Sequence, residues 1–473
     1  MVRQITLEQD VLQEGRPPLG RVVVVSASAA MSGFLFGYDT AVMNGAVQGV
    51  KDYFAIGDIA VGFIVSVALL GCAFGAMVAG WLADQFGRRA VMRVAAVLFL
   101  VGAIGSMYPS APWMLALWRA VGGLAIGFAS VIGPLYIAEV SPPAYRGRLS
   151  SLQQLAIVVG LAVSQLANYL IAAAAGGSAR GVMAGFEAWQ WMLGACAVPA
   201  VLYFLLASTI PESPRYLVAS GQDEQARAVF AELEGPGADV DGCVRDVRSA
   251  LSCDRKPRLT DLLDRKSLFP PVVWVGIGMA MFQQLVGINA VFYYSATLWQ
   301  SVGSNQSDSL LRSFSTSVIN IVGTLVAIAL IDKIGRKALL LIGSAGMTVA
   351  LGVEAWAFSF LLRQDGHVFL PHDAGLAALL AAHVFVFFFA ISWGVVLWVV
   401  LGEIFPARIR AAAISLATAC SWIANWMVTV SFPSLSTWNL SLTYAGYALF
   451  AAMSFFFVRF LVRETKGKTL EGA

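Results

Sequence analysis

DQFGRR, at residues 84–89, and DKIGRK, at residues 332–337, decide the fold of this chain, because one short motif occurs twice, 248 positions apart. Two further matches follow in the same order. Glu139 precedes Arg146 as Glu403 precedes Arg410, at an offset of 264, and PESPR at 211–215 has a counterpart in ETK at 464–466, at an offset of 252. Three matches in one order, at nearly one spacing, predict a duplicated unit.

The composition predicts that both units lie in a membrane. The 473 residues are 58% hydrophobic and 12% charged, with a mean hydropathy of +0.75, whereas soluble domains carry about 25% charged residues. Apolar runs such as 60–82 exclude a large water-soluble enzyme. The net charge of +3 does not indicate a nucleic-acid partner, and the five cysteines show neither a disulfide framework nor a metal-ligand spacing. We therefore expect an integral membrane protein with no metal site.

Twelve runs are long enough to span a bilayer, which takes about 20 mostly apolar residues. The first follows a polar segment and contains Asp39, so it is not a cleaved signal peptide. The predicted fold class is an all-α membrane protein with two six-helix bundles, residues 1–210 and 266–473, joined by a linker, 211–265, that bears short helices. The runs are 22–43, 58–82, 90–108, 111–138, 149–174, 189–209, 269–300, 310–331, 338–361, 375–402, 411–432 and 441–462.

Basic residues are distributed unevenly over the segments between the runs. The side of both termini carries 26 Lys and Arg residues, and the other side carries Lys51, Arg180, Arg312 and Arg363. Because positive loops stay in the cytoplasm, we expect a multi-pass protein of the cell (inner or plasma) membrane with both termini cytoplasmic. Parallel repeats are typical of transporters that rock two bundles about a central site. The absence of a phosphate-binding loop argues against ATP-driven transport.

Charged side chains recur at the cytoplasmic ends of the runs. A bias toward positive inner loops accounts for the basic residues but not for the acidic ones. Carboxylates and guanidiniums at helix ends can form bidentate pairs. We hypothesise that they form an inner latch between the bundles, which favours the outward-open state and consists of Asp84, Arg88, Arg89, Glu139, Arg146, Glu212, Asp332, Arg336, Glu403 and Arg410.

Four ionisable side chains lie within the apolar runs: Asp39, Arg119, Glu354 and His383. Such groups are rare in spans and are functional candidates. Asp39 and Arg119 carry opposite charges in one bundle and are expected to pair, so that protonation of Asp39 releases the pair; the alternative is a static ion pair. For Glu354 and His383 a structural role is favoured, because neither has a partner that the sequence indicates.

The seventh run carries FQQLVGINAVFYY at 282–294, which places three amides and two phenols around a glycine. Amides offer donors and acceptors without charge, as a neutral, hydroxyl-rich ligand requires. Further amides stand at Gln165, Asn320 and Asn425, and tryptophans at 398 and 426 offer flat apolar faces. A single amide can simply join helices, and a single tryptophan can anchor at the interface; together they indicate a carrier for a neutral polar solute.

These motifs resemble the sugar porter family of the major facilitator superfamily. The resemblance runs from FGYDT at 36–40 to ETKGKTL at 464–470 and includes, in family order, GRR at 87–89, PESPR at 211–215, QQ-x-x-G-x-N at 283–289 and EIFP at 403–406. It implies the major facilitator fold. The chain is similar to bacterial proton-coupled xylose or glucose symporters and is related to animal glucose facilitators.

The resemblance implies roles for particular residues. Asp39 would take the coupling proton and Arg119 would tune it; the facilitators carry asparagine at the first position, so Asp39 favours symport. Three positions depart from the family: Gln85 for Arg, Arg463 for the Pro before Glu464, and Val395 for a Pro, which implies a stiffer helix. The implied sugar ligands are Gln165, Gln283, Gln284, Asn289, Asn320, Trp398 and Asn425.

The sequence thus predicts a proton-coupled symporter that imports a monosaccharide, pentose or hexose, by alternating access. It is expected to be no enzyme, to need no cofactor beyond the coupling proton, to have sugar, protons and the lipid bilayer as partners, and to work as a monomer. Two alternatives stay open: an uncoupled sugar facilitator in which Asp39 is structural, and a sugar sensor, which the short segment after the last motif disfavours. The sequence does not select the sugar.

Overall fold

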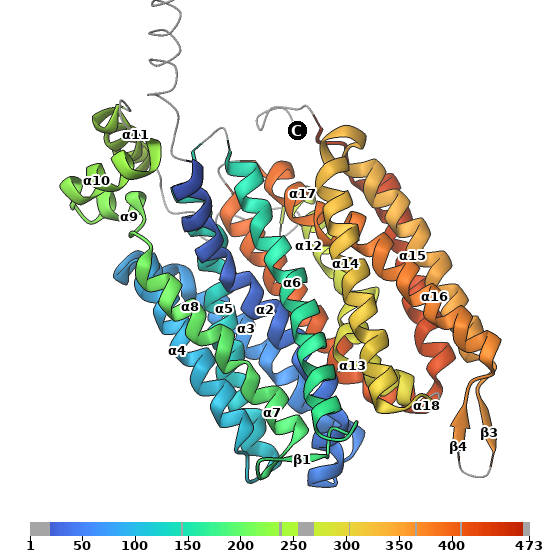
Figure 1. The fold of residues 1–473 in the computed structure, drawn as a ribbon. Helices are drawn as coiled ribbons and strands as arrows, with labels where there is room; N and C mark the ends of the chain where they lie inside the picture. The colour runs from blue at the N-terminus through green and yellow to red at the C-terminus, as the bar shows by residue number, and fades with distance from the viewer. Residues whose placement is uncertain are drawn as a thin grey trace, which may run out of the picture.

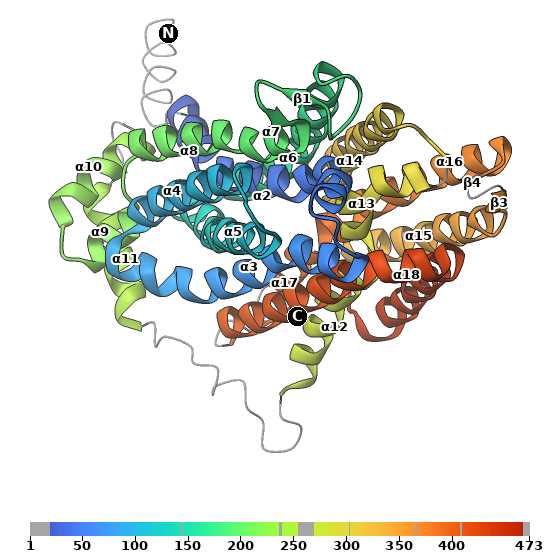
Figure 2. The ribbon, with the colours of Figure 1, turned by 90° about the horizontal axis from the view of Figure 1, so that it is seen from below.

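The computed structural model describes residues 19–142, 145–235, 239–253, 269–301, 303–364, 367–406 and 409–466. Long helices dominate these residues, and they form two groups that lie side by side (Figures 1 and 2). The start of α2 and the short helices α9 to α11 lie at one face, which we call the linker face. The hairpins β1–β2 and β3–β4 lie at the opposite face.

The first bundle contains six spanning segments. Its first five are single helices, and the sixth divides at Cys196 into α7 and α8. A short hairpin precedes α7. The elements are α2 (Leu19–Phe54), α3 (Asp58–Phe86), α4 (Arg88–Met107), α5 (Pro112–Val140), α6 (Arg146–Ala174), β1 (Val182–Met183), β2 (Phe186–Glu187), α7 (Ala188–Ala195) and α8 (Ala197–Thr209).

Three short helices follow the first bundle in the linker: α9 (Pro214–Ala219), α10 (Asp223–Glu234) and α11 (Val240–Cys253). They pack through a small apolar cluster of Leu217, Val218, Ala226 and Val244. An ion pair of 2.6 Å between Arg21 of α2 and Glu232 of α10 attaches them to the first bundle.

The second bundle is less regular than the first. Its elements are α12 (Pro271–Leu285), α13 (Ile288–Ser301), α14 (Gln306–Ile334), α15 (Arg336–Phe358), β3 (Leu362–Gln364), β4 (His367–Phe369), α16 (His372–Phe389), the π-helical turn η2 (Ala390–Gly394), α17 (Val396–Ile404) and α18 (Arg410–Leu461). Within α18, Asn439 has extended backbone angles (φ −160°, ψ 103°) and separates the last two predicted spans.

The described residues contain eleven helical spans that are long and apolar enough to cross a membrane, and the last of them holds both final runs. The prediction of twelve transmembrane helices in the major facilitator arrangement is confirmed, since α18 counts as two. The stiffening implied by Val395 stays a prediction; the structure shows a π-helical turn, η2, which ends at Gly394 and interrupts the helix without a proline.

The repeated glycines of the two GRR/GRK motifs have a backbone role. Gly87 and Gly335 have φ of +92° and +99°, a region that favours glycine because it has no Cβ. Each glycine ends one helix and lies directly before the next: α3 and α4 in the first bundle, α14 and α15 in the second. Each turn therefore presents its arginine at the first residue of the new helix.

Candidate functional site

The charged motifs form two matching clusters at the linker face. In the first bundle Arg88 donates from Nε and Nη2 to both carboxylate oxygens of Glu139, at 3.0 Å each, and Ser213 donates to the same carboxylate. Glu212 accepts the backbone N–H groups of Arg88 and Arg89 at the start of α4. A carboxylate at a helix N-terminus accepts hydrogen bonds from free N–H groups, and its negative charge is attracted by the positive end of the helix dipole.

The second bundle contains a matching cluster. Arg336 donates to both oxygens of Glu403, at 3.2 and 3.0 Å, and Thr465 donates to the same carboxylate. Glu464 accepts the backbone N–H groups of Arg336 and Lys337. The predicted duplication therefore extends to individual hydrogen bonds.

The latch residues were predicted to pair between the bundles, but the ion pairs that the structure describes in this conformation are different. The ion pairs described for these residues close within one bundle: Arg88 with Glu139 and Asp84, and Arg336 with Glu403. Arg89 and Arg410 donate to backbone carbonyls nearby, and the side chains of Arg146 and Asp332 lie outside the described residues. A meeting of the two sets across the bundles in the outward-open state stays a prediction.

The two clusters differ in their electrostatics. Burial raises the pKa of Glu212, although backbone N–H donors of Ser213, Arg89 and Arg88 oppose it. Burial also acts to raise the pKa of Glu464, but there the N–H donors of Lys466, Arg336 and Lys337 outweigh it and the pKa is lowered. The cluster of the first bundle is therefore less accessible to water than the cluster of the second.

We expect Arg88→Ala to destabilise the protein more than the matched change Arg336→Ala. The side chains of Arg88 and Glu139 are 7% and 6% exposed, against 13% and 27% for Arg336 and Glu403. Breaking a buried pair leaves an uncompensated charge and costs about 3–5 kcal/mol, and water screens the loss in the second cluster. Thermal unfolding in detergent measures both, and Arg88→Ala/Glu139→Ala should recover part of the loss. Equal losses would contradict this account.

The predicted proton-site residues lie together in the first bundle. Arg119 of α5 donates from Nη1 to Oδ1 of Asp39 on α2 at 2.5 Å, and the two side chains are only 3% and 8% exposed. An unbroken α2 carries Asp39, and Gly37 brings α2 so close to α6 that an added Cβ would lie 1.9 Å from the Ile157 carbonyl oxygen. Close packing of glycine thus holds the aspartate inside the bundle.

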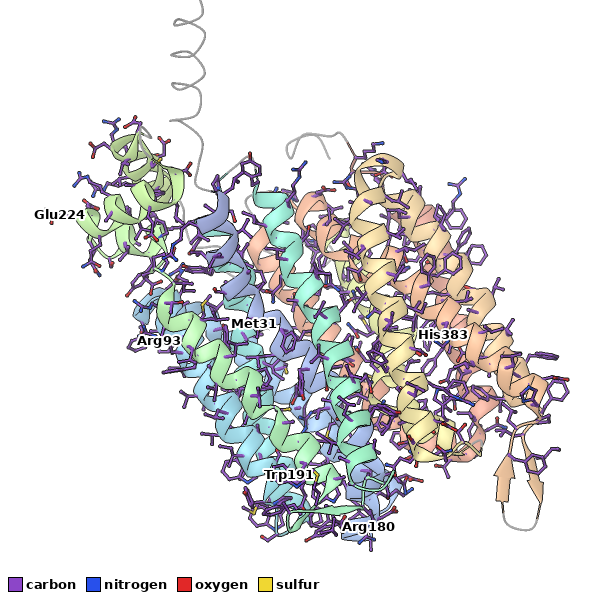
Figure 3. All side chains as sticks on the ribbon, viewed as in Figure 1. Met31, Arg93, Arg180, Trp191, Glu224 and His383 are labelled. Atoms are coloured by element: carbon purple, nitrogen blue, oxygen red, sulfur yellow. The ribbon has the colours of Figure 1, made fainter. Side chains whose placement is uncertain are left out.

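The other two charged candidates lie in the second bundle. His383, labelled in Figure 3, has partners that the sequence did not indicate: Nδ1 donates to the Leu379 carbonyl at 2.7 Å, and Nε2 shares a hydrogen bond of 2.8 Å with the hydroxyl of Ser315 on α14. It therefore joins α16 to α14. Glu354 is 1% exposed, and its Oε1 has no hydrogen-bond partner among the described residues.

The amides of the seventh run gather at a break in the helix. Gly287, with φ of +84°, separates α12 from α13, and the hydrogen bonds cross this break. Asn289 donates to Gln284 at 2.6 Å, and Gln284 donates to Gln283 at 3.2 Å and to Ser421 of α18 at 3.0 Å. Gln283 donates to the Trp393 carbonyl of η2 at 2.8 Å. Irregular backbone of this kind occurs inside membranes where it is buried or lines a cavity.

The remaining predicted sugar ligands are placed differently. Asn425 accepts from Thr429 and lies one helical turn beyond Ser421, and Asn320 of α14 is 5% exposed. Gln165 is fully buried in the first bundle, with Nε2 unpartnered among the described atoms. Trp398 is 42% exposed and has no described hydrogen bond. The structure thus brings Gln283, Gln284 and Asn289 together and leaves Trp398 apart from them.

Asn44 is the residue that the sequence prediction missed. It donates to Gln165 at 2.9 Å and accepts the backbone N–H of Ala296 at 2.8 Å and the hydroxyl of Ser295 at 3.3 Å. It therefore connects a predicted sugar ligand to α13 of the other bundle. An amide five residues after Asp39 in an apolar run was a usable signal.

Hydrogen bonds between the bundles, in the described part of the chain, lie away from the linker face. Besides the Asn44 contacts, Thr437 of α18 donates to Asp58 at the start of α3, and Gln306 at the start of α14 accepts from the Ala179 backbone. These positions belong to helix ends at the opposite face (Figure 1). This conformation is closed at the opposite face.

Asn44→Ala should weaken that closure. It removes the acceptor for the Ala296 N–H and the Ser295 hydroxyl of the other bundle, each bond worth about 1 kcal/mol, so the equilibrium between closed and open states should shift by about tenfold or more. Spin labels at positions 59 and 438, on α3 and α18, report the distance across the opposite face. Asn168→Ala is the matched control, because the hydrogen bonds of Asn168 within the described residues go to α2 carbonyls of its own bundle. An unchanged distance distribution in Asn44→Ala would refute the role.

The described residues show no cluster of three or more His, Cys, Asp and Glu side chains that could hold a metal ion. The structure contains two six-helix bundles. The first bundle holds a buried ion pair, and the second holds uncharged amides at a broken helix. Together these define a membrane carrier for a polar solute.

Comparisons with known proteins give the family. The family profile described as "Sugar (and other) transporter" matches residues 25–473. The chain is 50% identical over 452 residues to the glucose transport protein of Synechocystis sp., covering 95% of this chain and 96% of the relative. It is 34% identical to the D-xylose-proton symporter of Escherichia coli, covering 94% of each. The chain belongs to this family of sugar transporters in the major facilitator superfamily.

A solved structure agrees with the fold. The partially occluded inward open conformation of the xylose transporter XylE from E. coli superimposes with a TM-score of 0.81 and 32% identity, over 95% of this chain and all of that one. The protein is therefore a multi-pass plasma-membrane sugar transporter and not an enzyme.

Proposed function

We propose that the protein is a proton-coupled monosaccharide symporter that imports sugar by alternating access, with the linker face and both termini in the cytoplasm. The observation that carries the proposal is the buried pair of Asp39 and Arg119. A carboxylate inside a span is costly, and here its direct contact is with a guanidinium in the same bundle. One relative is named a glucose transport protein and another a D-xylose-proton symporter, and these names support the sugar and the proton parts of the proposal.

The proposed coupling follows from this pair. With Asp39 ionised, the pair is closed and neutral overall. A proton on Asp39 removes the attraction and frees Arg119, so α2 and α5 gain freedom to shift. Asn44 on α2 bonds to Gln165 and to α13, and the same helix therefore connects the proton site with a sugar ligand and with the closure between bundles.

The proposed sugar site is the amide set of α12 and α13 with Gln165, Asn320 and Asn425. Within α12 and α13, Gln284 donates to Gln283 and accepts from Asn289, and sugar hydroxyls can replace these bonds one for one. Trp398 would provide an apolar face. We rank glucose first among the candidates, since the relative named for glucose shares 50% identity against 34% for the one named for xylose.

A facilitator is the second candidate. The burial of the Asp39–Arg119 pair, in which both side chains are almost fully buried, also suits a static pair that only holds α2 to α5. In that case sugar would equilibrate across the membrane and no proton would move.

Sugar-evoked proton uptake by proteoliposomes separates the two. The panel is glucose, xylose, galactose, fructose and a polyol, each added outside liposomes with a pH indicator in the external medium. Alkalinisation by one sugar supports symport and names the substrate. Equilibration of labelled sugar without a pH change would replace the symporter proposal with the facilitator.

A further inference from the structure

A small cavity lies inside the first bundle, beside the ion pair. It has a volume of about 10 Å³ and lies among α2, α4, α5 and the start of α8. Such a volume is close to the least that holds one water molecule. Its wall includes the polar side chains of Asp39, Arg119, Trp118, Ser106 and Cys196, and Gly122 also lines it.

The wall carries buried donors without partners. Nε and Nη2 of Arg119 and Nε1 of Trp118 have no hydrogen-bond partner among the described residues, and Arg119 is 3% exposed. Only Nη1 of Arg119 bonds to Asp39. Buried N–H groups of a charged side chain are costly when unsatisfied, so a polar cavity of this size calls for a hydrogen-bond acceptor. The acceptor must be small and neutral.

The cavity is separate from the proposed sugar site. The cavity residues all belong to the first bundle, whereas the amides of α12 and α13 belong to the other, and Gln165, the sugar-site residue of the first bundle, does not line the cavity. Arg119 lies seven residues from the start of α5, about 10 Å along the axis, and Ser106 is one residue from the end of α4. The cavity therefore lies in the half of the membrane near the opposite face.

We propose that this cavity is a binding site for one water molecule, which accepts from Arg119 and sets the pH at which the Asp39–Arg119 pair opens. When Asp39 takes a proton, Arg119 loses its anionic partner while staying charged. A bound water then solvates the guanidinium and makes the protonated state accessible at higher pH. Without this water the free guanidinium is unsolvated, and a lower pH is needed to protonate Asp39. The pH effect rests on the proposed symport; the water site itself does not.

Other titratable groups that face Asp39 are uncharged near neutral pH. They are the thiols of Cys72 on α3 and Cys196 at the start of α8, and the phenol of Tyr293 on α13, whose ordinary pKa values lie above 8. On α6 the titratable residue nearest this level is Tyr169, beside the Asn168 that packs on Gly45. The charge of Arg119 therefore determines how readily Asp39 takes up a proton.

Gly122→Ala tests the site without disturbing the ion pair. Gly122 lines the cavity, and a Cβ built on it meets no atom within 4 Å, so a methyl group enters without a clash and takes the space of the water. Gly80→Ala on α3 and Gly352→Ala on α15 are matched controls, because their Cβ positions are equally open. Gly122→Ser is the rescue, since its hydroxyl can accept in place of the water.

The first readout is the pH profile of sugar-driven proton uptake. Gly122→Ala should move the half-maximal pH down by about one unit, comparable to one hydrogen bond to a charged group, while the controls coincide with the wild type and Gly122→Ser returns toward it. A Gly122→Ala profile that superimposes on the wild type overturns the role in proton binding. Absence of any sugar-driven proton uptake in the wild type refutes the proposed function instead.

The second readout does not depend on protons. Alanine is the better helix former, so the two controls should keep or raise the midpoint of thermal unfolding. Gly122→Ala should lower it, because the Arg119 and Trp118 N–H groups lose their acceptor. A midpoint that rises as in the controls shows that no water was displaced, and overturns the water site even if the transporter moves no protons.

Discussion

Replacing Asp39 with asparagine should abolish accumulation of sugar against a gradient while leaving sugar exchange intact. Asparagine keeps the size of the side chain and an oxygen that accepts from Arg119, but it carries no proton through the cycle. A membrane potential supplies about 2.3 kcal/mol per 100 mV, and a pH difference supplies about 1.4 kcal/mol per unit. Together these sustain a several-hundred-fold accumulation, and Asp39→Asn should reduce it to equality across the membrane.

Two transport assays measure this result. Labelled sugar uptake under an imposed proton gradient gives the accumulation ratio, and counterflow with sugar on both sides gives the exchange rate without net proton movement. Asp39→Glu, which keeps a titratable group, is the control and should retain part of the accumulation. Sugar accumulation by Asp39→Asn at the wild-type level would move the proton site elsewhere in the chain.

The charged clusters could be predicted from the sequence, because the residues that form them are close to helix ends and occur in both halves of the chain. An arginine directly after a turn glycine and a glutamate at the end of the fourth helix of each bundle occur in the same order in both halves, so a matching geometry was a strong expectation. Ser213 and Thr465 were missed as partners of Glu139 and Glu403. A hydroxyl in a polar loop carries no signal of its own.

The site in the second bundle was less predictable. The residue types Gln, Gln and Asn indicated polar ligands, but their partner at η2 is the backbone carbonyl of Trp393, and a carbonyl is present at every residue. The π-helical turn is a tertiary effect that propensity does not encode. Trp398, chosen for its ring, is 42% exposed, whereas Trp393 is fully buried with its Nε1 donating to Ser344.

Contacts between helices are the part of this structure that a single sequence predicts least well. The sequence places Asp39 and Arg119 in one bundle, and opposite charges in a membrane seek each other. It does not determine which face of α2 meets α6 and which meets α13. For this reason Asn44, whose amide reaches both neighbours, was identified only from the structure.

The approach of α2 to α6 leads to the second large effect. Gly37→Val should prevent correct folding, because a Cβ at this position would lie 1.9 Å from the Ile157 carbonyl oxygen and 3.0 Å from the Leu161 nitrogen. Overpacking usually costs about 1–3 kcal/mol, and this case should cost more because the obstacle is backbone and not a movable side chain. A displaced α2 would also move Asp39 away from Arg119.

The matched control is Gly80→Val. It makes the same substitution inside a long helix, α3, at a position where a Cβ meets nothing within 4 Å, so the loss of glycine and the gain of a β-branched side chain cancel in the comparison. Size-exclusion profiles and thermal unfolding in detergent should show a folded monodisperse Gly80→Val protein and little folded Gly37→Val protein. If both fold equally well, α2 can shift along α6 at little cost, and glycine packing does not hold the proton site in place.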